Sequence, residues 1–197
     1  MFRRLIRKIR CRAGTSRDVE IAWVLPVSDE VGNHVRKLQF GILDRYGVND
    51  GVKASPHVTV KMGFSIKLSE IDSYTGYLEE AARETAPFEI SINGFGFFDE
   101  GIVFLGVEKT DRLESFRRKM LVDLSKRFGI EPYPIEGDRF RFHVTLARGL
   151  SKGDIRNTYR DLKGQEPEFH FVSDMLELIC YTEDQWVTYR RAKLCGR

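Results

Sequence analysis

The tetrapeptide His57-Val58-Thr59-Val60 returns as His143-Val144-Thr145-Leu146 in the second half of the chain. Both copies lie where polar and apolar residues alternate, which is typical of a β-strand. Side chains two residues apart on a strand point to the same face, so each copy presents an imidazole and a hydroxyl together and its aliphatic residues to the other face. The repeat therefore predicts two similar lobes that bring two imidazoles and two hydroxyls around one concavity.

The segments around the two motifs predict a mixed α+β fold. Extended structure is expected over residues 21–27, 54–64, 88–98, 101–109, 169–181 and 186–194, with 88–98 and 101–109 forming a hairpin. Helices are expected over 30–46, 69–86, 112–128 and 152–162. Asp111 is the expected cap of the third helix, and Gly129 its stop.

Composition places the chain among soluble globular proteins. It has 197 residues, of which 42% are hydrophobic and 12% aromatic, enough for the core of one domain. Charge interrupts every hydrophobic run well before the roughly 20 residues that a membrane-spanning helix needs. The three cysteines Cys11, Cys180 and Cys195 form no C-x-x-C pair, so reduced thiols and a cytoplasmic location are expected.

The first 17 residues differ in charge from the remainder. They hold seven basic residues and no acid, whereas residues 18–197 hold 25 basic and 29 acidic side chains. Phe2, Leu5, Ile6 and Ile9 have the spacing of one helical face. Residues 1–17 are therefore interpreted as a basic amphipathic arm before a single bilobal domain at 18–197. A solvated tail, a helix that contacts RNA or a membrane surface, and an organellar transit peptide all remain open for this arm.

Two imidazoles on one surface suit acid–base chemistry near neutral pH. An unperturbed imidazole titrates near pH 6.5, so one ring can accept a proton while the other donates one, and hydroxyls can hold phosphate oxygens. One histidine on a β-strand is usually structural. Here two of the four histidines lie in the same sequence, His-Val-Thr, which favours a two-histidine site. His34 and His170 lack the frame and are expected to be surface or core residues. No zinc, Walker or nucleophile-elbow motif is present.

At these residues the sequence resembles the 2H phosphoesterase superfamily, named for two H-x-[ST]-hydrophobic motifs and including 2′-5′ RNA ligases and RNA 2′,3′-cyclic phosphodiesterases. The resemblance extends over residues 21–194, although Phe142 stands where many members have proline. It implies a bilobal, pseudo-twofold α+β fold with two antiparallel sheets facing a central cleft and helices outside. It also implies that no metal or cofactor is needed.

The resemblance assigns His57 and His143 as the acid–base pair and Thr59 and Thr145 as donors to the nonbridging phosphate oxygens. Which histidine is the base stays open. Arg148 and Lys61, which follow the motifs, are further candidates to approach phosphate, although charges at strand ends are more often simply exposed. The aromatic residues considered for stacking on a nucleobase are Phe64, Tyr133 and Phe142.

These expectations lead to a metal-independent phosphodiesterase acting on a 2′,3′-cyclic phosphate at an RNA end or on a small nucleotide. Ligation would be the reverse reaction in the same site. The alternatives are cleavage of 2′-5′ linked oligonucleotides or of an ADP-ribose cyclic phosphate, and a non-catalytic module that binds RNA or a membrane through residues 1–17. The acidic body favours small substrates or short RNA ends. A monomer is expected.

Overall fold

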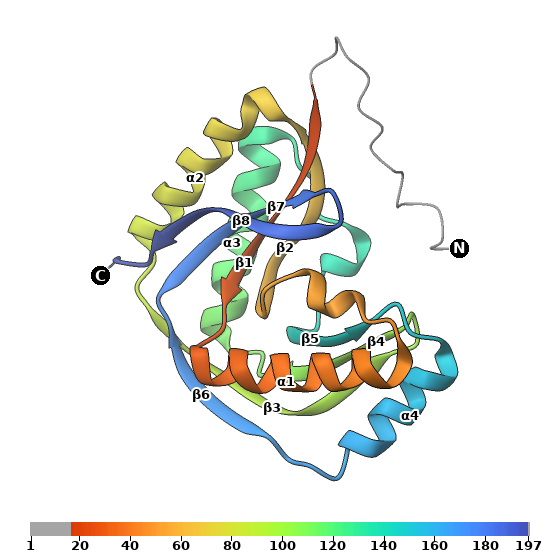
Figure 1. Cartoon of the computed structure of the whole chain (residues 1–197). Helices are drawn as coiled ribbons and strands as arrows, with labels where there is room; N and C mark the ends of the chain where they lie inside the picture. The colour runs from red at the N-terminus through yellow and green to blue at the C-terminus, as the bar shows by residue number, and fades with distance from the viewer. Residues whose placement is uncertain (1–16, 197) are drawn as a thin grey trace.

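Eight antiparallel strands form one sheet in the computed structural model, which describes residues 17–196 (Figure 1). Their order across the sheet is β6-β3-β4-β5-β2-β1-β7-β8. The strands are β1 (Asp18–Pro26), β2 (His57–Lys67), β3 (Phe88–Phe98), β4 (Ile102–Val107), β5 (His143–Arg148), β6 (Glu168–Ser173), β7 (Met175–Thr182) and β8 (Gln185–Lys193).

The sheet consists of two four-stranded halves that meet at the two motif strands. Strand β2 pairs with β5 through a single register position, Val58 opposite Val144. The first half contains β2, β1, β7 and β8, and the second contains β5, β4, β3 and β6. The α+β class is thus confirmed, and the strands expected in two antiparallel sheets form the two halves of one continuous sheet.

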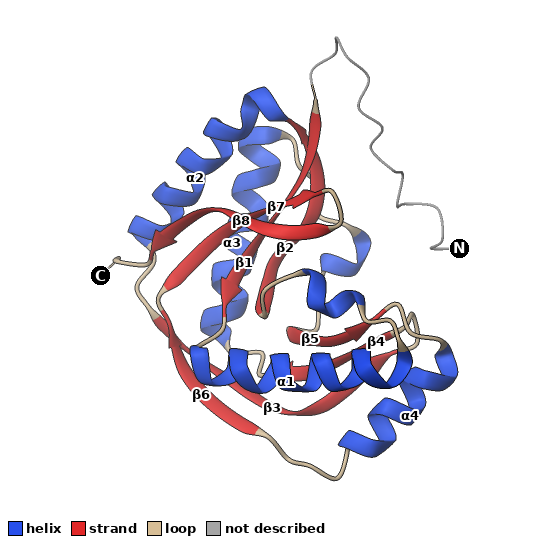
Figure 2. Ribbon diagram, in the orientation of Figure 1, coloured by secondary structure: helices blue, strands red, loops and turns tan. Residues whose placement is uncertain are grey.

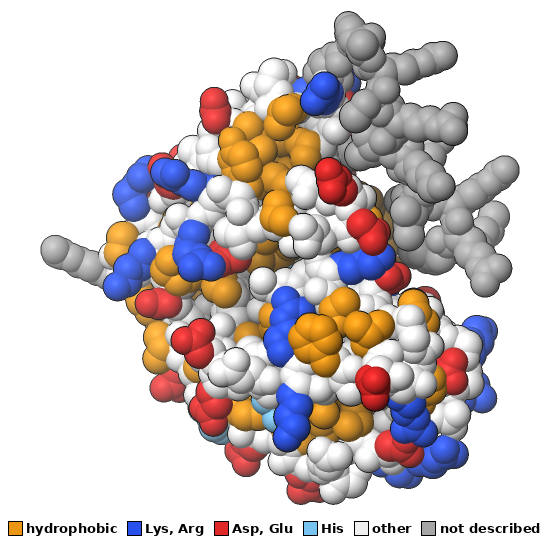
Figure 3. All heavy atoms as spheres, in the orientation of Figure 1, with side chains coloured by type: hydrophobic (Ala, Val, Ile, Leu, Met, Phe, Trp, Pro, Cys, Tyr) orange, Lys and Arg blue, Asp and Glu red, His pale blue; other side chains and the backbone are white. Residues whose placement is uncertain are grey.

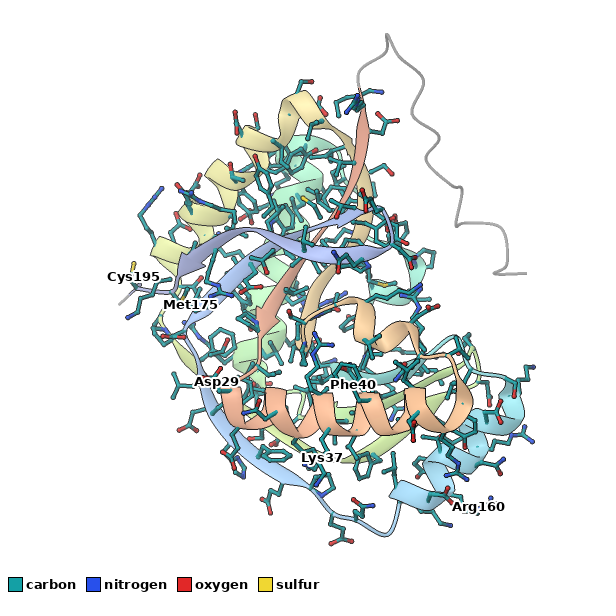
Figure 4. All side chains as sticks on the ribbon, viewed as in Figure 1. Asp29, Lys37, Phe40, Arg160, Met175 and Cys195 are labelled. Carbon is teal, nitrogen blue, oxygen red and sulfur yellow. The ribbon has the colours of Figure 1, made fainter. Side chains whose placement is uncertain are left out.

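Within residues 17–196, four α-helices cover the two halves. They are α1 (Asp29–Tyr46), α2 (Ile71–Glu84), α3 (Asp111–Phe128) and α4 (Lys152–Leu162), and the 3₁₀ turns are η1 (Asp50–Lys53), η2 (Leu68–Glu70) and η3 (Pro134–Glu136). Helix α2 packs on β7 and β8 and α3 on β2, whereas α1 packs on β5 and α4 on β3 and β4 (Figure 2). Asp29, Lys37 and Phe40 mark the course of α1 (Figure 4).

The helices exchange places between the halves. Helix α1 is the last α-helix before the first motif strand in the chain, yet it packs on the second motif strand, β5. Helix α3 is the last α-helix before β5, yet it packs mainly on β2, with further contacts to β3. The two halves of the chain are therefore interleaved. None of the helices within residues 17–196 is both long and apolar enough to cross a membrane.

The core lies between the sheet and these helices. Ile21, Trp23 and Leu25 of β1 are fully buried, and the Trp23 ring packs 5.7 Å from the ring of Tyr77 on α2. On α3 the buried side chains recur every three or four residues, as a helix with one apolar face requires; they are Leu113, Phe116, Arg117, Met120, Leu121 and Leu124.

Two local expectations are wrong. Residues 169–181 are not one strand, because the chain leaves β6 at Ser173 and enters β7 at Met175, in the other half of the sheet. Apolar residues lie on both sides of the polar pair Ser173-Asp174, so the sequence reads as one continuous strand and does not reveal the crossing. The cap of α3 is Thr110, whose hydroxyl accepts from the Leu113 amide at 3.2 Å, and Asp111 is already the first helical residue.

Replacing this cap distinguishes the two assignments. We expect Thr110→Ala to lower the free energy of unfolding by about 1 kcal/mol, because an amide of the first turn loses its acceptor. Asp111→Ala removes only a favourable charge near the helix N-terminus and should lower it by about 0.5 kcal/mol. Urea unfolding of both variants measures the difference, and a larger loss for Asp111→Ala would contradict the assignment.

Candidate functional site

The polar residues of both motifs lie on one face of the sheet. Val58, Val60, Val144 and Leu146 are fully buried, whereas the histidines and threonines between them are partly exposed. Because β2 and β5 are antiparallel and Val58 lies opposite Val144, the register sets His57 opposite Thr145 and Thr59 opposite His143. Each imidazole thus faces the hydroxyl of the other motif, and the two imidazoles lie on a diagonal.

Both imidazoles are held by the same contact. Nδ1 of His57 lies 2.6 Å from the carbonyl oxygen of Ser55, and Nδ1 of His143 lies 2.8 Å from that of Arg141. A carbonyl oxygen can only accept, so each Nδ1 carries a proton and donates it. In the neutral ring Nε2 is then the basic atom, and it is the atom available to a ligand.

The surroundings of His57 shift its pKa in opposing directions. Burial, the largest influence, holds the pKa below its ordinary value, whereas the bond to Ser55 and the nearby carboxylate of Glu177 raise it. The guanidinium of Arg36 lowers it further. The Glu177 carboxylate is buried and ion-paired with Arg191 at 2.5 Å. A small hollow beside His57 includes Glu177 in its wall.

His143 has a more basic and more aromatic environment. Burial again lowers its pKa most, the bond to the Arg141 carbonyl raises it, and the charges of His57 and Arg141 lower it. The influence of His57 reflects the proximity of the two rings. Phe98 and Phe104 pack against His143 with ring centroids 5.2 and 5.1 Å away. Arg141 lies over both phenyl rings, at 5.4 and 5.1 Å.

Three charged neighbours of the histidines were not identified from the sequence: Arg36, Arg141 and Glu177. Arg141 could have been found, since it lies two residues before His143 on the same chain segment. Arg36 and Glu177 are brought to His57 by α1 and β7, which no local pattern reveals. Arg36 is fixed by hydrogen bonds from Nη1 to Gln39 Oε1 and to the Val52 carbonyl, at 2.9 and 3.1 Å.

The two basic residues that follow the motifs have different surroundings. Arg148 is exposed at the end of β5, and its charge lowers the pKa of Glu20 on β1 against the larger, raising effect of burial. Lys61 is completely buried and donates to Glu136 Oε2 at 2.5 Å, so it is neither an exposed strand-end charge nor a contact for phosphate, and both interpretations are wrong. A β-bulge explains this, because Thr59 pairs with Val24 and Lys61 with the adjacent Trp23, which turns Lys61 into the core.

The other aromatic residues and histidines considered from the sequence differ in exposure. Phe64 and Phe142 are buried and cannot stack on a base, whereas Tyr133 is 38% exposed. His34 packs on Phe169, and His170 is exposed on β6. Both described cysteines, Cys180 and Cys195, are free thiols. Within residues 17–196 no three His, Cys, Asp or Glu side chains are arranged to hold a metal ion.

Comparison with known proteins identifies the family. The model of the 2′-5′ RNA ligase superfamily matches residues 27–185, a span that contains both motifs. The chain belongs to the 2′-5′ RNA ligase superfamily. The resemblance to 2H phosphoesterases is thereby confirmed.

Relatives of this superfamily member agree in sequence and in fold. It is 28% identical over 145 residues to a Geobacillus kaustophilus protein named "Putative phosphoesterase", a match that covers 72% of this chain and 80% of that protein. Among solved structures, Thermus thermophilus TT0787 has a TM-score of 0.66 at 16% identity, covering 90% of this chain and 99% of that one. Escherichia coli LigT has a TM-score of 0.62 at 11% identity, covering 92% and 100%.

The lowered pKa values make a prediction about stability. The unfolded chain protonates its histidines near pH 6.5, whereas folded His57 and His143 resist protonation, so the unfolded state binds more protons as the pH falls. The two neutral histidines therefore do not reduce the free energy of unfolding above about pH 6.5, and they reduce it increasingly as the pH falls below that value. We expect the double variant His57→Gln/His143→Gln to lose less free energy of unfolding than the wild type between about pH 7.5 and about pH 5.

Urea unfolding at each pH measures this difference, with His170→Gln as the control at an exposed histidine of β6. An unchanged pH dependence in the double variant, or an equal reduction in His170→Gln, would contradict the prediction.

Proposed function

We propose that this protein is a metal-independent phosphodiesterase that opens a 2′,3′-cyclic phosphate at an RNA end or on a small nucleotide. The observation that carries the proposal is the pair of imidazoles on one face, each with Nδ1 bonded to a carbonyl and Nε2 available. Two such rings supply an acid and a base without a metal ion. Membership of a phosphoesterase family supports the reaction class.

In the proposed step, Nε2 of one neutral imidazole takes a proton from water as the water oxygen attacks phosphorus. The bond from phosphorus to one ribose oxygen breaks, and the other imidazole, protonated at Nε2, gives its proton to that oxygen. The product is a ribose phosphate monoester with a free neighbouring hydroxyl. Both rings are biased toward the neutral form in the free protein, and the negative phosphate favours protonation of one of them.

The different surroundings of the two imidazoles suggest which one is the acid and which one is the base. At His57 the carboxylate of Glu177 favours the charged form more than the guanidinium of Arg36 opposes it, whereas Arg141 and His57 itself both disfavour the charged form of His143. We therefore assign His57 as the acid and His143 as the base for hydrolysis. Thr59 and Thr145 would donate to the nonbridging oxygens, where negative charge increases in the transition state. Exposed Arg148 is a further candidate phosphate contact.

The substrate is proposed as a single phosphate group rather than a long polyanion. Acidic and basic side chains are interspersed over the face seen in Figure 3, so no broad basic surface supports tracking along RNA there. Solved complexes of Escherichia coli LigT contain 3′-AMP and phosphate, which fits a nucleotide-sized ligand. Ligation through the reverse reaction, 2′-5′ linked oligonucleotides and an ADP-ribose cyclic phosphate remain the alternatives within this chemistry.

The basic arm and the cellular location stand as proposals. Residues 1–16, for which an amphipathic helix and a contact with RNA or a membrane surface are expected, lie outside the described part of the chain. If the protein were only a binding module, deletion of residues 1–17 would abolish RNA or liposome binding and the wild type would turn over no substrate. The cytoplasmic location and the monomer are likewise proposed.

The decisive test uses a short RNA ending in a 2′,3′-cyclic phosphate, in the presence of EDTA. We expect wild type to open the ring and His57→Ala and His143→Ala each to lower kcat by at least about a hundredfold, since each loses a proton-transfer group. His170→Ala is the matched control and should retain activity.

Activity near wild type in either motif variant would overturn the two-histidine mechanism. If folded wild type leaves this RNA unchanged, a panel containing a 2′-5′ linked dinucleotide and an ADP-ribose cyclic phosphate separates the alternative substrates from a non-catalytic module.

The threonines are tested by removing only the hydroxyl donor. We expect Thr59→Val and Thr145→Val each to lower kcat/KM on the order of a hundredfold, because a donor to the developing charge is lost. Thr59→Ser and Thr145→Ser keep the donor and should recover most of the activity. Equal activity of the valine and serine variants in steady-state assays would contradict the role.

A further inference from the structure

Two buried polar side chains bond to the backbone of the motif strands. They are Asn49, 3% exposed, just before η1, and Glu136, 1% exposed, in η3. Strands β2 and β5 share one register pair, so the backbone groups beyond that pair lack a strand partner on this side. Buried backbone groups of this kind need other hydrogen-bond partners.

Asn49 supplies these partners to β5. Its Nδ2 donates to the Leu146 carbonyl at 2.9 Å and to the Gln39 carbonyl at 3.0 Å, and its Oδ1 accepts from the Arg148 amide at 3.1 Å. Gln39 adds a bond from Nε2 to the Thr145 carbonyl at 3.0 Å. A Cβ at Gly51 would lie 2.8 Å from Asn49 Oδ1 and 2.9 Å from the Leu146 oxygen, so η1 approaches β5 this closely because residue 51 is glycine.

Glu136 does the same for β2. Its Oε1 accepts from the Met62 amide at 2.8 Å, and its Oε2 accepts from Lys61 Nζ at 2.5 Å and from the Tyr133 amide at 2.8 Å. Its own carbonyl accepts from Arg117 on α3 at 2.8 Å. The carboxylate thus joins η3 to the bulged part of β2.

The two arrangements are related by the pseudo-twofold symmetry. In β5 the bulge falls between Thr145 and Ala147, which pair with the adjacent residues Phe104 and Val103. This is the same place, relative to its histidine, as the bulge of β2. The two bonded amides, Arg148 and Met62, also stand at equivalent places after their histidines. Each side chain therefore fixes the strand where its bulge ends.

The support is crossed between the two halves of the chain. Asn49 belongs to the segment before the first motif but holds the second motif strand, and Glu136 belongs to the segment before the second motif but holds the first. We propose that Asn49 and Glu136 are positioning residues, Asn49 for His143 and Thr145 and Glu136 for His57 and Thr59. Their effect on turnover rests on the proposed function, whereas their effect on the imidazoles does not.

The test follows the titration of His57 and His143 by NMR in the full-length protein, so no substrate is needed. Asn49→Leu removes the bonds to β5 at similar volume. For Glu136, two double variants both remove the Lys61–Glu136 ion pair, and both equally remove the carboxylate that lies 3.9 Å from Arg117. Lys61→Met/Glu136→Gln keeps a side-chain carbonyl oxygen for the Met62 amide, and Lys61→Met/Glu136→Leu does not. Leu78 on α2 is fully buried, so Leu78→Ala leaves a cavity in the core. This variant is the control for a general loss of stability.

We expect a crossed result. Asn49→Leu should admit water around His143 and raise its pKa toward the ordinary value, with His57 little changed. Lys61→Met/Glu136→Leu should raise the pKa of His57 and leave His143 little changed, whereas Lys61→Met/Glu136→Gln and Leu78→Ala should move neither. The proposal is overturned if Asn49→Leu moves both rings or neither, or if the two double variants behave alike.

Turnover of the cyclic-phosphate RNA separates this proposal from the function. We expect Asn49→Leu and Lys61→Met/Glu136→Leu to lower kcat on the order of ten- to a hundredfold, because a reacting group is displaced. Crossed titration with a wild type that leaves this RNA unchanged would uphold the positioning role and reject the cyclic phosphate of an RNA end as the substrate. If wild type is active but the variants do not shift the two imidazoles in the crossed pattern, the phosphodiesterase is upheld and the positioning role is rejected.

Discussion

The structure depends on one main-chain pairing, that of Val58 with Val144, where the two halves of the sheet meet. Both valines are fully buried, so the pairing aligns the motif strands and anchors them in the core at once. With only this register pair, the strands beyond it need hydrogen bonds from elsewhere. The side chains of Gln39, Asn49 and Glu136 supply such bonds, and the polar residues of both motifs keep one common face.

The buried Lys61–Glu136 pair illustrates how this requirement outweighs the preference of charges for water. Burying an ion pair is favourable only if its geometry is good and further hydrogen bonds satisfy both ions. Glu136 makes such bonds to two backbone amides, and Lys61 lies 4.3 Å from the centre of the Tyr133 ring. The pair therefore belongs to the framework of β2 rather than to the surface that carries the histidines.

Most of the fold could be predicted from the sequence because its signals are local. The repeated tetrapeptide gave the two lobes, and apolar periodicity gave the helices close to their observed bounds. The break at Asp174, the bulge before Lys61 and the approach of Arg36 and Glu177 to His57 could not be predicted. Each depends on which segment lies alongside in space, and an alternating pattern reads the same whether or not a strand changes partners.

The position of β1 has a consequence for how the chain folds. This strand comes early in the sequence but lies inside the sheet, between β2 and β7, with Glu20 opposite Tyr181 and Val24 opposite Glu177. The hydrogen bonds between β1 and β7 can form only when a segment near the other end of the chain is available. Contacts between segments so distant in sequence form slowly, because the entropy cost of closing the loop between them comes first. During synthesis on the ribosome, the apolar edge of β1 stays open until β7 has emerged, which makes this the interval in which the nascent chain is most exposed to mispairing.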